Sequence, residues 1–212
     1  MFDVFKNAWK VEDIREKLLY TLLIIVVFRL GAAIPVPFLD ASALSAMFGA
    51  NSGNLLGYLN MLTGGALSMA TVFALSISPY ITASIVIQLL TIAIPALERL
   101  SKEGGEEGKR KIQNITRFST VGIALIQGIG YFFLIKNNGF LVENAGVWAG
   151  IVVVASFCAG SSLLMWLGEQ INAKGIGNGI SILLFAGIVS RIPQDTIMMW
   201  EAFKRGGLYY AY

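Results

Sequence analysis

Long apolar runs, separated by polar or glycine- and proline-rich segments, dominate the chain. A transmembrane helix needs about 17–25 predominantly apolar residues. The pattern predicts an all-α integral membrane protein with five transmembrane helices. We expect these spans at about 18–34, 70–97, 118–135, 147–168 and 177–199.

Prolines set two of the expected boundaries. Pro35 and Pro37 end the first span, because each X-Pro step disfavours continuation of the helix. The second span is interrupted by Pro79 and Pro95. Polar groups are expensive against lipid, so this span should border a cavity or another helix. Its polar residues are Ser76, Ser78, Tyr80, Thr82, Ser84 and Gln88.

The connection between the first two spans contains a weaker apolar segment, Asn54–Ala66. As a helix, its residues would reach only about 20 Å, less than the roughly 30 Å of a bilayer's hydrocarbon core. The segment therefore cannot span. It either lies at the membrane interface or re-enters a cavity lined by protein.

Composition agrees with this class and excludes several chemistries. Hydrophobic residues make up 56% of the chain and charged residues only 14%, against about 25% charged in soluble domains. The chain has no histidine, which removes the usual general base and a common metal ligand. Its one cysteine, Cys158, has no internal partner and is expected to pack as a small core residue. We expect no enzyme activity, cofactor or metal.

Basic residues indicate the orientation. Lys6, Lys10, Arg15 and Lys17 precede the first span, so the N-terminus should be cytoplasmic, and no signal-peptide cleavage is expected. The loop 98–117 falls on the same side and holds the largest basic cluster. This cluster fits topology and anionic lipid, with a ribosome or nucleic-acid surface as the alternative. Within the first span, Arg29 either snorkels outward or pairs inside the bundle.

Two pairs of bulky aliphatic residues have helical spacing. Ile77 and Ile81 are four residues apart, as are Ile180 and Leu184, so each pair would share a helix face. The spacing alone fits ordinary core packing. Between the fourth and fifth spans, glycines at 175, 177 and 179 permit tight turns, and Asn178 suits a helix cap. Without a preceding strand or a P-loop lysine, nucleotide binding is not expected.

Two long stretches carry a family resemblance. Residues 78–90 (SPYITASIVIQLL) and 165–182 (MWLGEQINAKGIGNGISI) are similar to the two signatures of the SecY translocon subunit. Shorter agreements occur at 27–31, 34–37, 64–67, 108–111 and 185–189. The resemblance covers about 11–193, nearly the whole chain.

This resemblance implies half of a ten-helix inverted-repeat channel for protein translocation and lateral insertion into a bacterial cytoplasmic membrane. The chain resembles the N-terminal half, so the missing C-terminal half is an expected partner. Other implied partners are SecE and SecG-type small subunits, the SecA motor or the ribosome, signal sequences, nascent chains and lipid.

The resemblance also implies roles for particular residues. It assigns Ile77, Ile81, Ile180 and Leu184 to a hydrophobic pore ring. It assigns a short re-entrant plug helix at about 54–66, with Asn54, Leu55, Leu56, Tyr58, Leu59, Met61 and Leu62. Ser84, Ile85 and Gln88 are assigned to a lateral gate.

Other functions compete with the channel. A small-solute secondary transporter would need ionisable groups at mid-membrane, where Arg29 stands almost alone. An intramembrane metalloprotease would need histidine ligands. A fragment or scaffold role for an isolated half is a further alternative.

Overall fold

The computed structural model describes residues 11–50, 60, 63–141 and 146–204. In these ranges the regular secondary structure is helical, which confirms the all-α class, and two isolated β-bridges accompany it. The helices are α2 (Glu12–Gly31), α3 (Ala41–Ala50), α5 (Ser78–Ala93), α6 (Pro95–Lys102), α7 (Gly105–Asn137), α8 (Val147–Lys174), α9 (Gly179–Val189) and α10 (Ile192–Lys204).

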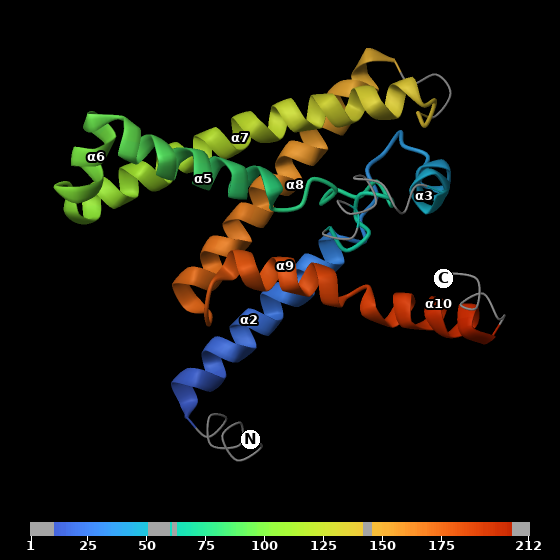
Figure 1. The fold of residues 1–212 in the computed structure, drawn as a ribbon, viewed down its shortest axis with the longest axis horizontal. Helices are drawn as coiled ribbons and strands as arrows, with labels where there is room; N and C mark the ends of the chain where they lie inside the picture. Colours follow the sequence, from blue (N-terminus) through green and yellow to red (C-terminus); the bar gives the residue numbers. More distant parts are fainter. Residues whose placement is uncertain (1–10, 51–59, 61–62, 142–145, 205–212) are drawn as a thin grey trace.

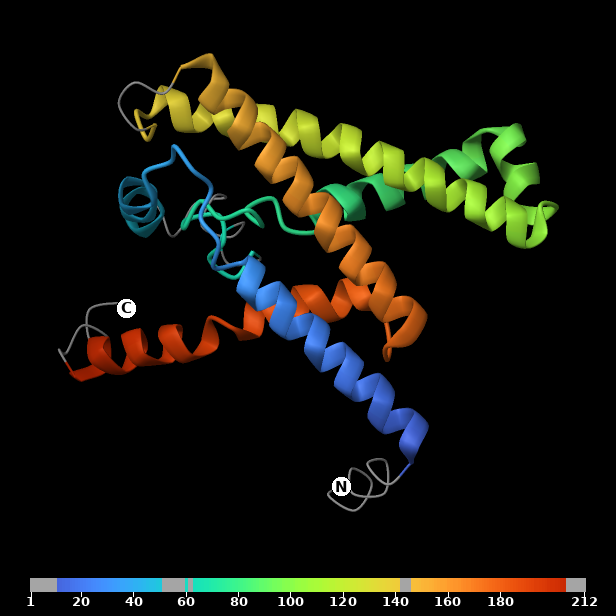
Figure 2. The same ribbon diagram turned by 180° about the vertical axis from the view of Figure 1, so that it is seen from behind.

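The helices form an open arrangement around α8. Helix α7 packs along both α5 and α8, while α2 and α9 pack on the C-terminal part of α8 (Figure 1). Seen from behind, α10 continues from α9 and projects away from this group (Figure 2). Two buried apolar clusters result, one joining α3, α7 and α8 and the other joining α2, α8 and α9.

Two of the described helices are long and apolar enough to cross a membrane. These are α7, with 33 residues, and α8, with 28. Helices α5 and α6 meet the same criterion together, but they are bent by 101° at their junction. By length and composition the described residues thus contain two such helices, or three if the bent pair is one span.

Proline chemistry explains both ends of α5. Ile94 has extended backbone angles, φ −107° and ψ 112°, because the following proline disfavours the helical region. The predicted interruption at Pro95 is therefore present. Pro79 lies in the first turn of α5, where its missing N–H group is not needed. It starts the helix, which begins at Ser78 and not near Ala70.

Residues 63–77 form turns with a β-bridge at Thr71, so the first part of the span expected at 70–97 is not helical. Ala70 and Ser76 have positive φ angles of 50° and 54°. The connection after α2 supports this irregular backbone: the Val36 N–H donates to the Ala70 carbonyl at 2.9 Å, and the Val72 N–H donates to that of Ile34 at 3.0 Å. Non-helical backbone at membrane depth requires such protein partners.

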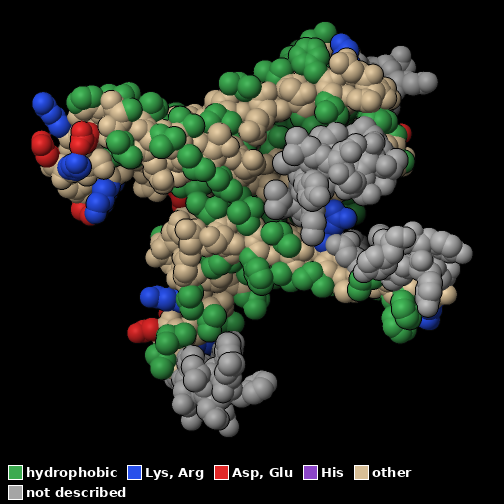
Figure 3. Space-filling view, in the orientation of Figure 1, with side chains coloured by type: hydrophobic (Ala, Val, Ile, Leu, Met, Phe, Trp, Pro, Cys, Tyr) green, Lys and Arg blue, Asp and Glu red, His purple; other side chains and the backbone are tan. Residues whose placement is uncertain are grey.

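The expected basic loop 98–117 is mostly helical, because α6 and the first turns of α7 occupy it. Charged side chains gather at this end of the molecule (Figure 3). Some form exposed pairs along one helix, such as Lys102 with Glu98 at 2.6 Å and Lys109 with Glu106 at 3.4 Å. Arg117 differs, because its partner lies on α8.

Only some of the small residues in the third and fourth spans lie at helix contacts. Gly128 packs on Val154 of α8, and Gly160 lies against the backbone of Val72. A side chain added at Gly122 would meet open space. Ala155 and Ala159, four residues apart on α8, are exposed.

Candidate functional site

Ile77 stands at the junction between the irregular segment and α5. Its carbonyl accepts hydrogen bonds from the N–H groups of Tyr80 and Ile81, both at 3.1 Å, so it caps the helix. Its side chain is 1% exposed. The Cδ1 atom lies 3.4 Å from the point where a Cβ on Gly168 would stand. Ile77 therefore anchors the start of α5 against α8.

The start of α9 is fixed by two asparagines. Asn178 Oδ1 accepts from the N–H groups of Ile180 and Ser181 at 3.0 and 3.4 Å, which confirms the predicted cap. Asn172 Oδ1, on α8, accepts from the Gly179 N–H at 2.7 Å. A Cβ at Gly179 would overlap the carbonyl oxygen of Gly168. These constraints place Ile180 beside α8.

The structure brings the four predicted ring residues into one apolar cluster. Ile77 belongs to its buried centre, while Ile81, Ile180 and Leu184 are partly buried and pack against that centre. Segments about a hundred residues apart in sequence thus meet. Buried neighbours from α8 and α9 include Leu164, Leu167, Ile171 and Leu183, and α2 adds Ile24 and Phe28.

An uncharged cavity of about 430 Å³ adjoins this cluster. Ile81 and Leu184 both line it, so α5 and α9 both border the cavity. Ile77 and Ile180 are not among its lining residues. Its other walls are mainly apolar, with a few hydroxyl and amide groups, and comprise Thr63, Leu67, Ala74, Leu75, Ser76, Ser78, Gln127, Gly130, Tyr131 and Leu134.

The predicted plug residues at 54–59, 61 and 62 lie outside the described residues. The chain just after them reaches the cavity through Thr63 and Leu67. Gly64 has a φ of 66°, and a Cβ there would lie 2.7 Å from the carbonyl oxygen of Gly187 on α9. Asn60 Oδ1 accepts from the Ser68 N–H at 2.9 Å, so two residues eight positions apart are bonded in this part of the chain.

The predicted lateral-gate residues occupy two different surfaces of α5. Gln88 Nε2 donates to Ser84 Oγ at 3.3 Å, and both side chains line a groove of about 280 Å³ beside α7. Ile85 lies outside this groove and is 53% exposed. The structure therefore does not gather the three into one contact.

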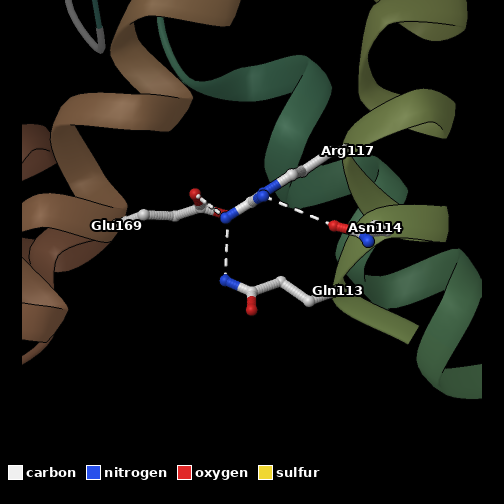
Figure 4. Close-up of polar contacts among 4 residues, drawn as sticks. All are labelled: Gln113, Asn114, Arg117 and Glu169. Carbon is white, nitrogen blue, oxygen red and sulfur yellow. Dashed lines mark hydrogen bonds and ion pairs between the residues drawn. The ribbon is translucent and has the colours of Figure 1, made fainter. Parts of the chain in front are cut away.

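An ion pair that was not predicted from sequence joins α7 to α8 (Figure 4). Arg117 Nε and Nη2 donate to the two oxygens of Glu169 at 2.9 and 2.7 Å. Gln113 Nε2 adds a third bond to Glu169, at 3.1 Å. Next along α8, Gln170 accepts from Tyr20 Oη at 3.2 Å. This end of α8 thus connects to both α7 and α2.

Two further residues singled out from sequence, Arg29 and Cys158, are half-buried. Arg29 is half-buried in the last turn of α2, where a cation complements the helix dipole, and it pairs with no described residue. Cys158 is half-buried, with Sγ 3.9 Å from the Val121 carbonyl oxygen. The predicted core position is therefore met only in part.

Comparisons with known proteins agree with this fold. The family model described as SecY matches residues 71–211. The Protein translocase subunit SecY of Bacillus subtilis is 44% identical over 204 residues, covering 95% of this chain and 46% of the relative. The chain therefore spans about half the length of the curated relatives it matches.

Two solved structures share the fold. Sec61 in a canine ribosome-channel complex has a TM-score of 0.57 at 20% identity, covering 84% of this chain and 36% of Sec61. A SecY structure reported for its plug domain has the same TM-score at 22% identity and the same coverage. Because the SecY model matches more than half of its residues, the chain belongs to the SecY family.

Proposed function

We propose that this chain forms the N-terminal half of a channel that moves unfolded polypeptides across a membrane and sideways into it. The observation that carries the proposal is the meeting of Ile77, Ile81, Ile180 and Leu184 beside an uncharged cavity. A constriction of apolar side chains excludes water and ions by dewetting, yet forms no fixed hydrogen bonds with a passing chain. Such a constriction seals without selecting a sequence.

In this proposal five spans surround half of the pore. They are α2, α5 with the turns before it, α7, α8, and α9 with the start of α10. The basic residues at the start of the chain and around α6 support a cytoplasmic N-terminus and a cytoplasmic α6–α7 turn. The second half of the channel supplies the remaining pore wall.

The segment around Asn54–Ala66 is proposed as the plug. The described residues at its C-terminal end and just after it support this role, because Thr63 and Leu67 line the cavity and Gly64 lies against α9. Ile85, exposed on α5, is proposed to face the route by which apolar segments leave for lipid. SecE- and SecG-type subunits, and SecA or a ribosome, are the proposed partners.

Ion conductance tests this function. In the full-length channel, replacing both Ile81 and Leu184 by glycine widens the constriction and lets water enter. We expect a raised resting ion leak in planar bilayers. The matched control replaces Ile92 and Val189, which lie on the same two helices outside the cavity. A leak that rises equally in both variants would contradict the proposal.

A further inference from the structure

An apolar groove of about 750 Å³ lies between α7 and α8, away from the pore-ring cluster. It follows α7 from Leu125 to Lys136, and Ile151 and Val154 lie on its α8 side. This volume is within the roughly 300–1,000 Å³ of ligand sites. Among its lining residues, Lys136 alone is charged.

A small residue on α8 shapes the groove. Gly150 lies against the ring of Phe132, and a Cβ there would come within 2.8 Å of its Cζ. Because Gly150 has no side chain, the end of the Phe132 ring fits against α8. Ile129 and Ile151 line the groove and are about half exposed, at 46% and 54%.

The length of the groove matches one leaflet of a bilayer. The rise along α7 from Leu125 to Lys136 is about 16 Å, close to half of a hydrocarbon core roughly 30 Å thick. Trp148, on the first turn of α8 near the Lys136 end, is 78% exposed. Tryptophan and lysine are typical of the boundary between hydrocarbon and headgroups.

We propose that this groove binds one acyl chain of an anionic phospholipid, whose headgroup lies at Lys136. The uncharged walls suit the chain, and the exposed ammonium group, which pairs with no described residue, suits the phosphate. A bilayer supplies this ligand at high concentration wherever the helices span it. The inference depends on membrane insertion of α7 and α8 and not on polypeptide transport.

Photocrosslinking in vesicles tests the site. The full-length protein is reconstituted in vesicles of phosphatidylcholine. Each sample also contains a trace of one probe, either phosphatidylglycerol or phosphatidylcholine, and the probe carries a diazirine midway along one acyl chain. Adducts are mapped by peptide mass spectrometry. We expect groove adducts at Ile129 and Ile151, with about fivefold more phosphatidylglycerol adduct, since one lysine near a membrane surface contributes roughly that factor.

Variants test the headgroup contact and the acyl-chain contact separately. Lys136→Gln should abolish the preference for phosphatidylglycerol, and Lys136→Arg should keep it. Ile151→Trp should lower adducts of both probes because it fills the groove. Its control is Ile126→Trp, the same replacement at a position on α7 that is 72% exposed and outside the groove.

Three results would overturn the proposal. The first is equal labelling at Ile126 and in the groove, as expected for ordinary boundary lipid. The second is equal yield from the two headgroups. The third is no groove adduct at all, as expected if a helix of another subunit covers it. Each would leave the channel proposal intact, because neither probe reports polypeptide transport.

Discussion

Arg117 and Glu169 form a two-point ion pair that joins α7 to α8 at 2.9 and 2.7 Å. The two partners differ in exposure: the Glu169 side chain is 10% exposed and that of Arg117 is 43% exposed. Removing the arginine would therefore leave a nearly buried carboxylate with one remaining partner, Gln113. The pair holds together the two longest apolar helices.

Arg117→Gln should lower the free energy of unfolding by about 1–3 kcal/mol, the usual penalty for leaving a buried acceptor unsatisfied. Thermal unfolding in detergent measures the loss. The control is Lys109→Gln, which breaks an exposed pair within α7. Exposed pairs contribute roughly 0–1 kcal/mol. Equal losses in the two variants would show that the α7–α8 pair has no special stabilising role.

Gly160→Ala should destabilise the fold, because its Cβ would overlap the carbonyl oxygen of Val72, a backbone atom that cannot rotate away. Overpacking of this kind costs about 1–3 kcal/mol. Gly122→Ala, at a position with open space, should raise the free energy of unfolding by about 0.5–1 kcal/mol through helix propensity. Unfolding temperatures in detergent compare the two, and a stabilised Gly160→Ala protein would contradict the packing.

Ile77 and Ile81 should respond differently to truncation. Ile77 is 1% exposed in the apolar cluster, so Ile77→Ala should cost about 2–5 kcal/mol of stability. Ile81 is only partly buried and lines the cavity, so Ile81→Ala should cost less and raise ion leak more. Unfolding temperature in detergent and ion conductance in planar bilayers are measured on both variants. Equal losses of stability and equal ion leaks would contradict the different roles of the two residues.

Asp40 should make stability depend on pH. Its carboxylate accepts from the hydroxyl of Ser42 and from the N–H of Ala43, and these bonds lower its pKa below the usual 3.8. A lowered pKa in the folded state means that the charged group stabilises α3 above the unfolded pKa. This contribution is lost as pH falls through the folded value.

The measurement is the difference in unfolding temperature between the native protein and Asp40→Ala. We expect it to be constant at neutral pH and to shrink as pH falls below about 4. Asp40→Asn, which keeps an acceptor without a titrating charge, serves as the control. A difference that stays constant into strong acid would show that the charge of Asp40 does not stabilise the helix.

Local chemistry predicted several boundaries from sequence. The interruption at Pro95 and the cap at Asn178 depend on residues close in the chain, and the structure has both. The start of α5 depends on distant partners instead. Residues near Ala70 are apolar enough for a helix, but they bond to Val36 and its neighbours after α2. A pattern of apolar residues cannot reveal such bonds.

The candidate site shows the same limit. Spacing alone could not distinguish Ile77 and Ile81 from ordinary packing residues, and the family resemblance supplied the assignment. Glu169 lies inside a signature stretch, yet its partner Arg117 was counted with a basic loop. In the structure α7 begins at Gly105, so Arg117 lies on this helix and not in a loop. From there its side chain reaches Glu169 on α8.

The most direct test of the channel is to identify what Ile81 faces while a polypeptide is in transit. A photocrosslinker replaces Ile81 in the full-length channel, and a secretory chain is stalled within it. Ile92, on the same helix and 78% exposed, is the comparison site. We predict adducts to the stalled chain from position 81 and adducts to lipid from position 92. Lipid adducts alone from position 81 would contradict the account.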